Sequence, residues 1–277
     1  MEQARGCLEL TRPGNAVAAG GLTFVGAFVA GGLSAPAPAA FAVVATVLAT
    51  GGGNAINDYF DREIDAINRP DRPIPRGAVS PRGALLFSGL LFAVAVGLTL
   101  LLPLFAVAIA LINLVALVAY TELFKGLPGV GNALVAYLTG STFLYGGAAV
   151  EGNLSPVVVL FALAASATMA REVVKDVEDA AGDREEGLRT LPIVLGRRRA
   201  LAVAAAFVVA AVVASPAPYL LGTFGLPYLV VLAPALAVML GATYLAFESP
   251  AVGQRWLKVS MFAAAVAFVV GRAAVVL

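Results

Sequence analysis

The stretch NAINDYFDREIDAINRPDRPIPRG, Asn54 to Gly77, holds four aspartates and four arginines. The rest of the chain is very different, because 60% of all residues are hydrophobic and only 13% are charged. Soluble domains are typically near half apolar and a quarter charged. The composition therefore predicts a polytopic membrane protein, and this one segment concentrates much of its polar chemistry.

Apolar segments follow one another along the whole chain, with short breaks rich in proline and glycine between them. Because about 20 apolar residues cross a bilayer, the 277 residues suffice for one transmembrane domain, 1–277, without a separate soluble domain. We expect an all-α fold of nine transmembrane helices around a central cavity. The expected spans are 14–33, 39–60, 83–102, 103–120, 130–149, 155–175, 200–214, 224–247 and 257–277. The break at Pro103 allows either a turn between two helices or a kink in one long helix.

The residue types present exclude several kinds of chemistry. The single Cys7 excludes an internal disulfide, and the absence of histidine removes the commonest zinc and general-base chemistry. A formal net charge of +1 indicates no nucleic acid or acidic partner, and no heptad pattern or soluble tail points to a protein partner. The chemistry must therefore come from carboxylates, amides, hydroxyls and basic side chains.

The basic residues also predict an orientation. If the N-terminus is cytoplasmic, alternation of the nine spans puts every one of the 18 Lys and Arg residues except Arg272 on the cytoplasmic side. Such an excess is typical of cytoplasmic loops. We therefore expect a multi-pass protein of the cell membrane, with its C-terminus outside and the Asn54–Gly77 segment at the cytoplasmic face.

Four polar residues of this segment share one helical stripe. Asn54, Asp58, Asp61 and Asp65 follow one another at spacings of four, three and four residues. Like charges at these spacings destabilise a helix, and ionised carboxylates near hydrocarbon cost several kcal/mol. We expect a cation to compensate them.

A second acidic stripe repeats the first. In REVVKDVEDAAGDREEG, residues 171–187, three aspartates stand 118 residues after the first three, at Asp176, Asp179 and Asp183. Glu172 takes the place of Asn54. Both stripes fall at the cytoplasmic end of an inward-running span, so we expect a pseudo-repeat with two Asp-rich helix ends that face each other across the cavity.

Six carboxylates at one mouth suit a hard divalent cation. Mg²⁺ prefers oxygen ligands and is typically held by carboxylates together with substrate phosphates. Loops after the stripes supply arginines, whose planar fork matches phosphate oxygens. They are Arg69, Arg72 and Arg76 after the first stripe, and Arg184 and Arg189 after the second. These residues predict a site for a lipid-tailed diphosphate, although topology alone also favours arginines here.

The two stripes also carry a family resemblance. NDYFDREID (57–65) and DVEDAAGD (176–183) resemble the N-D-x-x-D-x-x-x-D and D-x-x-D-x-x-x-D signatures of the UbiA superfamily of intramembrane prenyltransferases. Arg12 with Pro13, and YTELFKG from Tyr120, are also similar to the family pattern. The resemblance covers essentially the whole chain and implies a single transmembrane prenyltransferase domain.

The resemblance implies a mechanism and a set of roles. Two Mg²⁺ ions would bridge an allylic prenyl diphosphate to the aspartates, and the departing diphosphate would leave a carbocation for a lipid-like acceptor to capture. The implied metal ligands are Asp58, Asp61, Asp65, Asp176, Asp179 and Asp183. The implied catalytic residues are Asn57, Asp61, Asp65, Lys125, Asp179 and Asp183. The expected substrate contacts are Arg12, Asn54, Arg69, Arg72, Tyr120, Lys175 and Arg189.

The acceptor depends on the branch of the superfamily. DREIDAINRPDRPIPRGAVS (61–80) is similar to the archaeal branch that makes digeranylgeranylglyceryl phosphate and nearly as similar to chlorophyll synthases. The first branch implies transfer of geranylgeranyl to the free hydroxyl of geranylgeranylglyceryl phosphate in archaeal ether-lipid biosynthesis. Arg76 stands where that pattern has serine, so an aromatic or tetrapyrrole acceptor remains an alternative.

Two other classes of membrane protein share some of these features. A secondary transporter also has repeats and intramembrane acids, but its charges should lie near the bilayer midplane rather than at one face. A CDP-alcohol phosphotransferase also uses aspartates and Mg²⁺, but its aspartates stand in one continuous segment. The prenyltransferase hypothesis is the one that accounts for both stripes.

Overall fold

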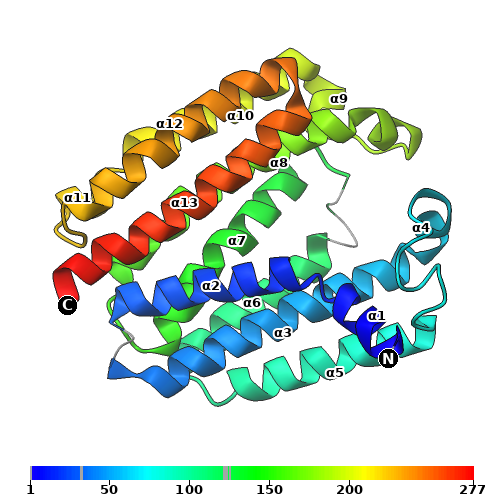
Figure 1. The fold of residues 1–277 in the computed structure, drawn as a ribbon, viewed down its shortest axis with the longest axis horizontal. Coiled ribbons are helices and arrows are strands. Elements are labelled where there is room, and N and C mark those ends of the chain that lie inside the picture. Colours follow the sequence, from blue (N-terminus) through cyan, green and yellow to red (C-terminus); the bar gives the residue numbers. More distant parts are fainter. Residues whose placement is uncertain (1, 32–33, 121–123, 125) are drawn as a thin grey trace.

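The computed structural model describes residues 2–31, 34–120, 124 and 126–277, and every regular element within these ranges is helical (Figure 1). The helices are α1 (Glu2–Leu10), α2 (Pro13–Ala30), α3 (Pro36–Phe60), α4 (Arg62–Asn68), α5 (Pro81–Thr99), α6 (Leu104–Ala119), α7 (Val130–Ala149), α8 (Leu154–Glu185), α9 (Leu191–Leu195), α10 (Arg197–Ala214), α11 (Ala217–Leu220), α12 (Pro227–Glu248) and α13 (Pro250–Val276). The all-α prediction is confirmed.

Each predicted span falls on one of these helices, with some shifted ends. The break at Pro103 is a turn, because α5 ends at Thr99 and α6 begins at Leu104. The largest difference is α8, which was predicted to end at residue 175 but continues to Glu185. The predicted span thus stopped just before the first aspartate of the second stripe, whereas the helix carries all three aspartates.

Seven of the described helices are long and apolar enough to cross a membrane, which fits a multi-pass membrane protein. The apolar stretch of α6, Leu104–Leu117, is shorter, and α7 is not among the seven. The prediction of nine spans therefore stays a prediction for α6 and α7. Large apolar side chains such as Leu86, Leu104 and Val213 face outward, as lipid contact requires.

Proline starts many of the helices. Pro13, Pro36, Pro81, Pro227 and Pro250 each occupy the first helical position, where the missing N–H would have no helical partner anyway. Arg197, at the start of α10, donates hydrogen bonds to the carbonyls of Phe247 and Glu248. A cation thus satisfies the carbonyl end of α12.

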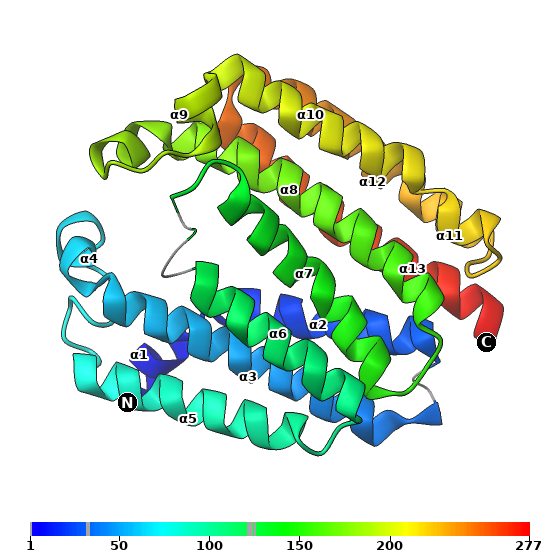
Figure 2. The same ribbon diagram turned by 180° about the vertical axis from the view of Figure 1, so that it is seen from behind.

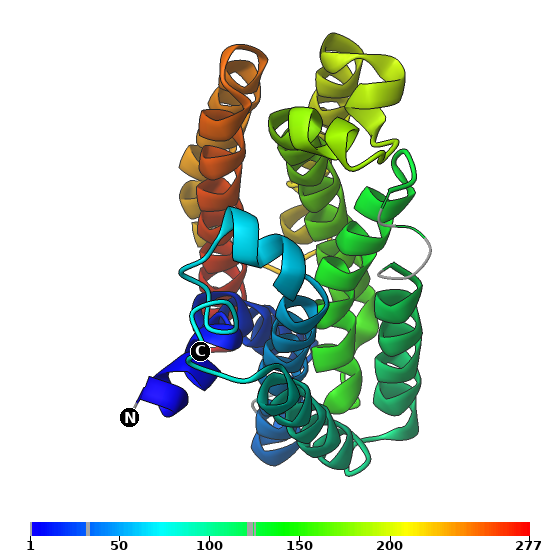
Figure 3. The same ribbon diagram turned by 90° about the vertical axis from the view of Figure 1, so that its right-hand side faces the viewer.

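The long helices run side by side, and the chain termini lie at opposite ends of the bundle (Figure 1). One buried cluster joins α8, α10, α12 and α13, and another joins α2, α7, α8, α12 and α13. Viewed nearly along the helices, the orange and red α13 lies next to the yellow-green α8, in agreement with the two buried clusters that both helices share (Figure 3). The α4 turn and the α8–α9 connection lie at the same end (Figure 2). Both acidic stripes are thus carried to one end of the bundle.

The α2–α7 contact depends on glycine. A Cβ atom at Gly26 would lie 2.1 Å from the Phe143 carbonyl oxygen, and one at Gly146 would lie 2.0 Å from the Thr23 carbonyl oxygen. Only a residue without a side chain lets the two backbones approach this closely, as in other membrane helix pairs.

We predict that Gly26→Ala lowers the stability of the protein by about 1–3 kcal/mol, because the added methyl group must separate α2 from α7. Gly21→Ala on the same helix is the matched control, since nothing lies within 4 Å of a Cβ there. Thermal unfolding of the detergent-purified variants measures the difference. Equal midpoints for the two variants would show that the close approach does not limit stability.

Candidate active site

The first acidic stripe is almost continuous but not one helix. α3 ends at Phe60 and α4 starts at Arg62, so Asp61 lies in the turn between them. The Asp61 N–H still donates to the Asn57 carbonyl and the Asp65 N–H to the Asp61 carbonyl, at 2.9 and 2.8 Å. The i to i+4 pattern thus persists through the turn, and the stripe keeps its shared face.

Arginines neutralise the two most buried carboxylates of this stripe. Asp58 is 4% and Asp65 is 6% exposed. Arg12 donates to Asp58 at 2.5 Å, while Arg72 lies 3.4 Å from Asp58 and also donates to Asp65. The predicted cationic compensation therefore comes from two separate chain segments, the start of α2 and the loop after α4.

The other predicted contacts of this region differ in their surroundings. The Asn54 amide donates to the Thr11 carbonyl at 2.9 Å, which ties α3 to the α1–α2 junction. Asn57 is half-buried, and Arg69 is exposed just after α4. Arg76 donates to Glu9 of α1 at 2.6 Å and thereby lowers the pKa of that carboxyl below its usual range. Arg76 is thus engaged with α1 rather than with the stripe.

The second acidic stripe lies on α8, and its hydrogen bond partners include uncharged side chains. Asn132 of α7 donates to Asp176 at 2.8 Å, and the Thr190 hydroxyl donates to Asp183 at 3.1 Å. Lys175 lies 3.4 Å from Asp179, and both side chains are about half exposed. Arg189 is exposed and contacts Gly126 only through its backbone N–H. Among the described residues, the second stripe pairs with the lysine Lys175, whereas the first stripe pairs with the arginines Arg12 and Arg72.

The two stripes share one end of the bundle, on α3–α4 and on α8 (Figure 2). Within the described part of the chain, no three acidic, cysteine or histidine side chains are close enough to hold one metal ion. Asp58 and Asp65 instead have arginine partners. The expected convergence of six carboxylates is thus not present as a preformed cluster in this arrangement.

Tyr120, at the end of α6, belongs with the second stripe. It lies within electrostatic range of Glu172, Lys175 and Asp176. The predicted catalytic Lys125 lies outside the described residues, so its position is not assigned. Tyr120 therefore brings the end of α6 to the α8 side of the bundle end.

A cavity of about 530 Å³ runs into the bundle beside the second stripe. Its walls come from α2, α7, α8, α12 and α13, with single residues of α3, α6 and α10. One end holds Tyr120, Arg171 and Glu172, whereas Phe143 and Phe268 lie further inside. These two phenylalanines are buried and meet edge to face, with ring centroids 6.2 Å apart.

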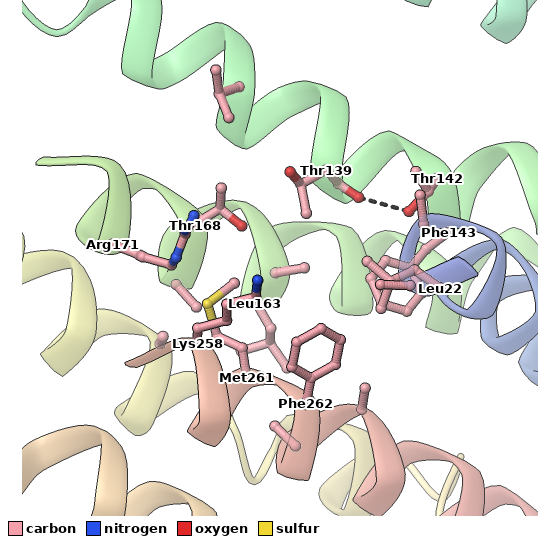
Figure 4. A pocket seen from close by; sticks show the side chains of 18 of the residues that line it. Leu22, Thr139, Thr142, Phe143, Leu163, Thr168, Arg171, Lys258, Met261 and Phe262 are labelled. Carbon is pink, nitrogen blue, oxygen red and sulfur yellow. Dashed lines mark hydrogen bonds between the residues drawn. The ribbon is translucent and has the colours of Figure 1, made fainter. Parts of the chain in front are cut away.

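Several polar residues of this cavity were not predicted as site residues. Thr139, Thr142 and Thr168 line it, as do Arg171 of α8 and Lys258 of α13 (Figure 4). The sequence pattern places Arg171 and Lys258 only among the basic residues that predict the orientation of the chain in the membrane. The available signal was weak, because single hydroxyls in an apolar span also occur as helix-packing residues.

The comparisons with known proteins agree with this geometry. The model of the UbiA prenyltransferase family matches residues 19–266. A digeranylgeranylglyceryl phosphate synthase of Natronomonas pharaonis is 78% identical over 276 residues, which is 100% of both chains.

Two solved structures resemble the fold. One, described as giving insights into "the biosynthesis of Digeranylgeranylglyceryl phosphate synthase in membranes", has a TM-score of 0.83 and 35% identity, covering 98% of this chain and 99% of that one. The other is a UbiA homolog from Archaeoglobus fulgidus bound to DMAPP and Mg²⁺, with a TM-score of 0.69 and 17% identity, covering 98% and 99%. At that identity the second match shows the fold alone.

The family match spans most of the chain, and the resemblance drawn from the two acidic motifs is confirmed. A prenyltransferase family also accounts for charges at one bundle end beside an apolar cavity, which the transporter alternative does not. The chain belongs to the UbiA prenyltransferase family.

Proposed function

We propose that this protein transfers a geranylgeranyl group from geranylgeranyl diphosphate to the free hydroxyl of geranylgeranylglyceryl phosphate, giving digeranylgeranylglyceryl phosphate. The structural observation that carries the proposal is the cavity, whose apolar interior and charged end suit a lipid-tailed phosphate. The synthase of that name from Natronomonas pharaonis, 78% identical along its whole length, supports the choice of acceptor.

The reaction exchanges one carbon–oxygen bond for another. The bond between prenyl carbon 1 and the diphosphate breaks, and the diphosphate leaves with the electron pair. The acceptor hydroxyl oxygen then bonds to carbon 1 and loses its proton. Charge accumulates on the leaving diphosphate, so cations and hydrogen bond donors at this point lower the barrier.

The oxygen-rich stripes fit Mg²⁺ better than a softer metal, because aspartates and an asparagine are the available donors. Asp58, Asp61, Asp65, Asp176, Asp179 and Asp183 are the residues that would hold it. Bound Mg²⁺ would neutralise negative charge on the diphosphate. Asp61, which is half-buried, is the most accessible carboxylate of the first stripe. Asp179, which is exposed, is the most accessible carboxylate of the second.

The protein's own groups position the donor. Arg12 and Arg72 hold Asp58 and Asp65 in place, and a bound diphosphate would offer these guanidiniums alternative acceptors. Asn57, Tyr120, Lys125, Arg69, Lys175 and Arg189 would complete the polar mouth. The apolar cavity walls exclude water, which protects a carbocation from hydrolysis.

We further propose that α6 and α7 also cross the bilayer, giving nine spans with both acidic stripes at the cytoplasmic face. The distribution of lysine and arginine favours this arrangement. Seven and nine crossings both put the termini on opposite sides, so the two topologies are distinguished by the side of the membrane on which Leu127, in the 120–129 connection between α6 and α7, lies.

We expect a transfer assay to identify the acceptor. Detergent-purified protein with geranylgeranyl diphosphate and Mg²⁺ should convert geranylgeranylglyceryl phosphate to the doubly alkylated product, as detected by mass spectrometry. Parallel tubes hold 4-hydroxybenzoate or a chlorophyllide. Transfer only to one of these would refute the proposed acceptor, and transfer to none by folded protein would refute the function.

Asp61→Asn and Asp179→Asn should each lower kcat by at least about 100-fold, because each removes a negative oxygen ligand from the site of charge development. Glu63→Gln and Glu178→Gln are the matched controls, since both are exposed neighbours of the stripes. Wild-type rates in the aspartate variants would exclude a metal-binding role for these two residues.

A single cysteine at Leu127 in a Cys7→Ser background should react with a membrane-impermeant maleimide only after the cells are permeabilised. Leu127 is exposed, and nine spans put it inside. Cysteine at the exposed Leu101 is the outside control and at the exposed Glu186 the inside control. Labelling of position 127 in intact cells would mean that α6 and α7 do not cross.

A further inference from the structure

Two polar groups of α8 lie buried beside the cavity without a protein partner. Thr168 is 2% exposed, and among the described residues its hydroxyl has no hydrogen bond partner. The Nε of Arg171 is likewise buried and unpaired within the described part of the chain. Unpaired polar groups in an apolar interior cost free energy, so a ligand that accepts hydrogen bonds would stabilise this site.

These groups share one face and one cavity. Thr168 and Arg171 stand three residues apart on α8, a spacing that puts both on the same side of a helix. Both line the cavity, and so does Lys258 of α13 from the opposite wall. Figure 4 shows Thr168 and Arg171 on one side of this space, with Lys258 on the other. Three donors from two helices thus line the same cavity, with Lys258 the exposed one of the three.

The local charge balance favours an anion. Arg171 donates to Glu172 at 2.5 Å, which occupies one edge of the guanidinium and leaves Nε available. Among the described residues that line this cavity, Glu172 is the acidic one, whereas Arg171 and Lys258 are both cationic. The cavity wall therefore has an excess of positive charge and unpaired donors, which matches the oxygens of a phosphate group.

We propose that Thr168, Arg171 and Lys258 form the subsite that binds the phosphate of the acceptor, geranylgeranylglyceryl phosphate. This inference rests on the proposed function and assigns that site its acceptor end. The donor diphosphate then belongs to the aspartate stripes, and the two phosphate-bearing groups of the reaction are held by different residues.

The separation of Arg171 and Asp176 along α8 fits a separate phosphate site for the acceptor and for the donor. Arg171 precedes Asp176 by five residues, which corresponds to about 7.5 Å along a helix axis. In the acceptor, the free hydroxyl is carried by a carbon next to the phosphorylated one. A reacting hydroxyl lies about 3–3.5 Å from the carbon that it attacks. The phosphate at Arg171 thus leaves the hydroxyl between the subsite and the acidic stripe.

The subsite also provides a physical basis for acceptor selection. An acceptor without a phosphate would leave the buried Thr168 hydroxyl and Arg171 Nε unpaired, while the exposed Lys258 ammonium would lose an anionic partner but keep its contact with water. Sites that hydrogen bond a substrate group discriminate strongly against analogues that lack it, because their buried donors stay unpaired. The acceptor's phosphate, rather than its prenyl chain, would therefore dominate its recognition.

The test compares acceptor kinetics in Lys258→Gln and Thr168→Val with the wild type. Lys258→Gln should raise KM for geranylgeranylglyceryl phosphate at least about tenfold, and Thr168→Val about threefold or more, because each loses a hydrogen bond to a charged group. KM for geranylgeranyl diphosphate should change by less than about twofold, since different residues bind the donor. Arg171 is left intact because its removal would strand the Glu172 charge.

Arg255→Gln is the matched control for Lys258→Gln. Arg255 lies three residues earlier on α13, is exposed, and does not line the cavity. This variant loses the same charge near the same membrane face, so it should keep the wild-type KM for both substrates. Thermal unfolding of all variants verifies that each is folded.

A second acceptor without the phosphate measures how much that group contributes to recognition. Geranylgeranylglycerol, which lacks that group, should be a poorer substrate for the wild type by at least about tenfold in kcat/KM. The two acceptors should become more alike in Lys258→Gln. No transfer to geranylgeranylglyceryl phosphate by the wild type would refute the proposed function itself. Active variants with unchanged acceptor KM, or with a raised donor KM instead, would refute the subsite alone.

Discussion

The arrangement of the bundle end depends on the neutralisation of Asp58 and Asp65. Both carboxylates are nearly excluded from solvent, and a charged group in that position is costly without a partner. Arg12 reaches Asp58 from the start of α2, where its own backbone takes the left-handed conformation, with φ 47°. Arg72 reaches both carboxylates from the loop after α4. Asp58 and Asp65 thus hold together the start of α2, the α3–α4 stripe and the loop after α4.

The same neutralisation relates the resting arrangement to ligand binding. Arg72 holds two carboxylates that the proposed mechanism assigns to Mg²⁺. Mg²⁺ bound by these carboxylates would leave the Arg72 guanidinium without its acceptors, and a diphosphate bound beside it would supply new ones. A free cation alone would meet a site that is already neutral. The pairing therefore favours binding of the metal diphosphate over either part.

Much of this architecture could be predicted from the sequence, because apolar length and proline breaks decide where membrane helices begin and end. The positions of the two acidic stripes followed from spacing alone, and the cationic compensation followed from the cost of burying charge. The sequence alone does not show which arginines neutralise Asp58 and Asp65. Arg12, Arg69, Arg72 and Arg76 look alike in a list of charges, and only the folded chain separates Arg72, on the acids, from Arg76, on Glu9.

Other differences also have physical reasons. The first stripe is interrupted at Asp61 whereas the second lies within α8, because identical spacing does not determine how the helix continues. Hydropathy misjudged the end of α8, since its charged last turns are stabilised by contacts with Asn132 and Thr190 rather than by an apolar environment. The polar lining of the cavity depends on which helix faces meet, so no local pattern identified Thr168 or Lys258 as neighbours.

The edge-to-face pair of Phe143 and Phe268 has a consequence for chain length. Both rings line the inner part of the cavity and are almost fully buried, so they act as its floor rather than as mobile walls. Phe143 belongs to α7 and Phe268 to α13, so the depth of the cavity depends on how these two helices pack. An isoprenoid chain bound with its diphosphate at the polar end would therefore be limited in length by these two rings.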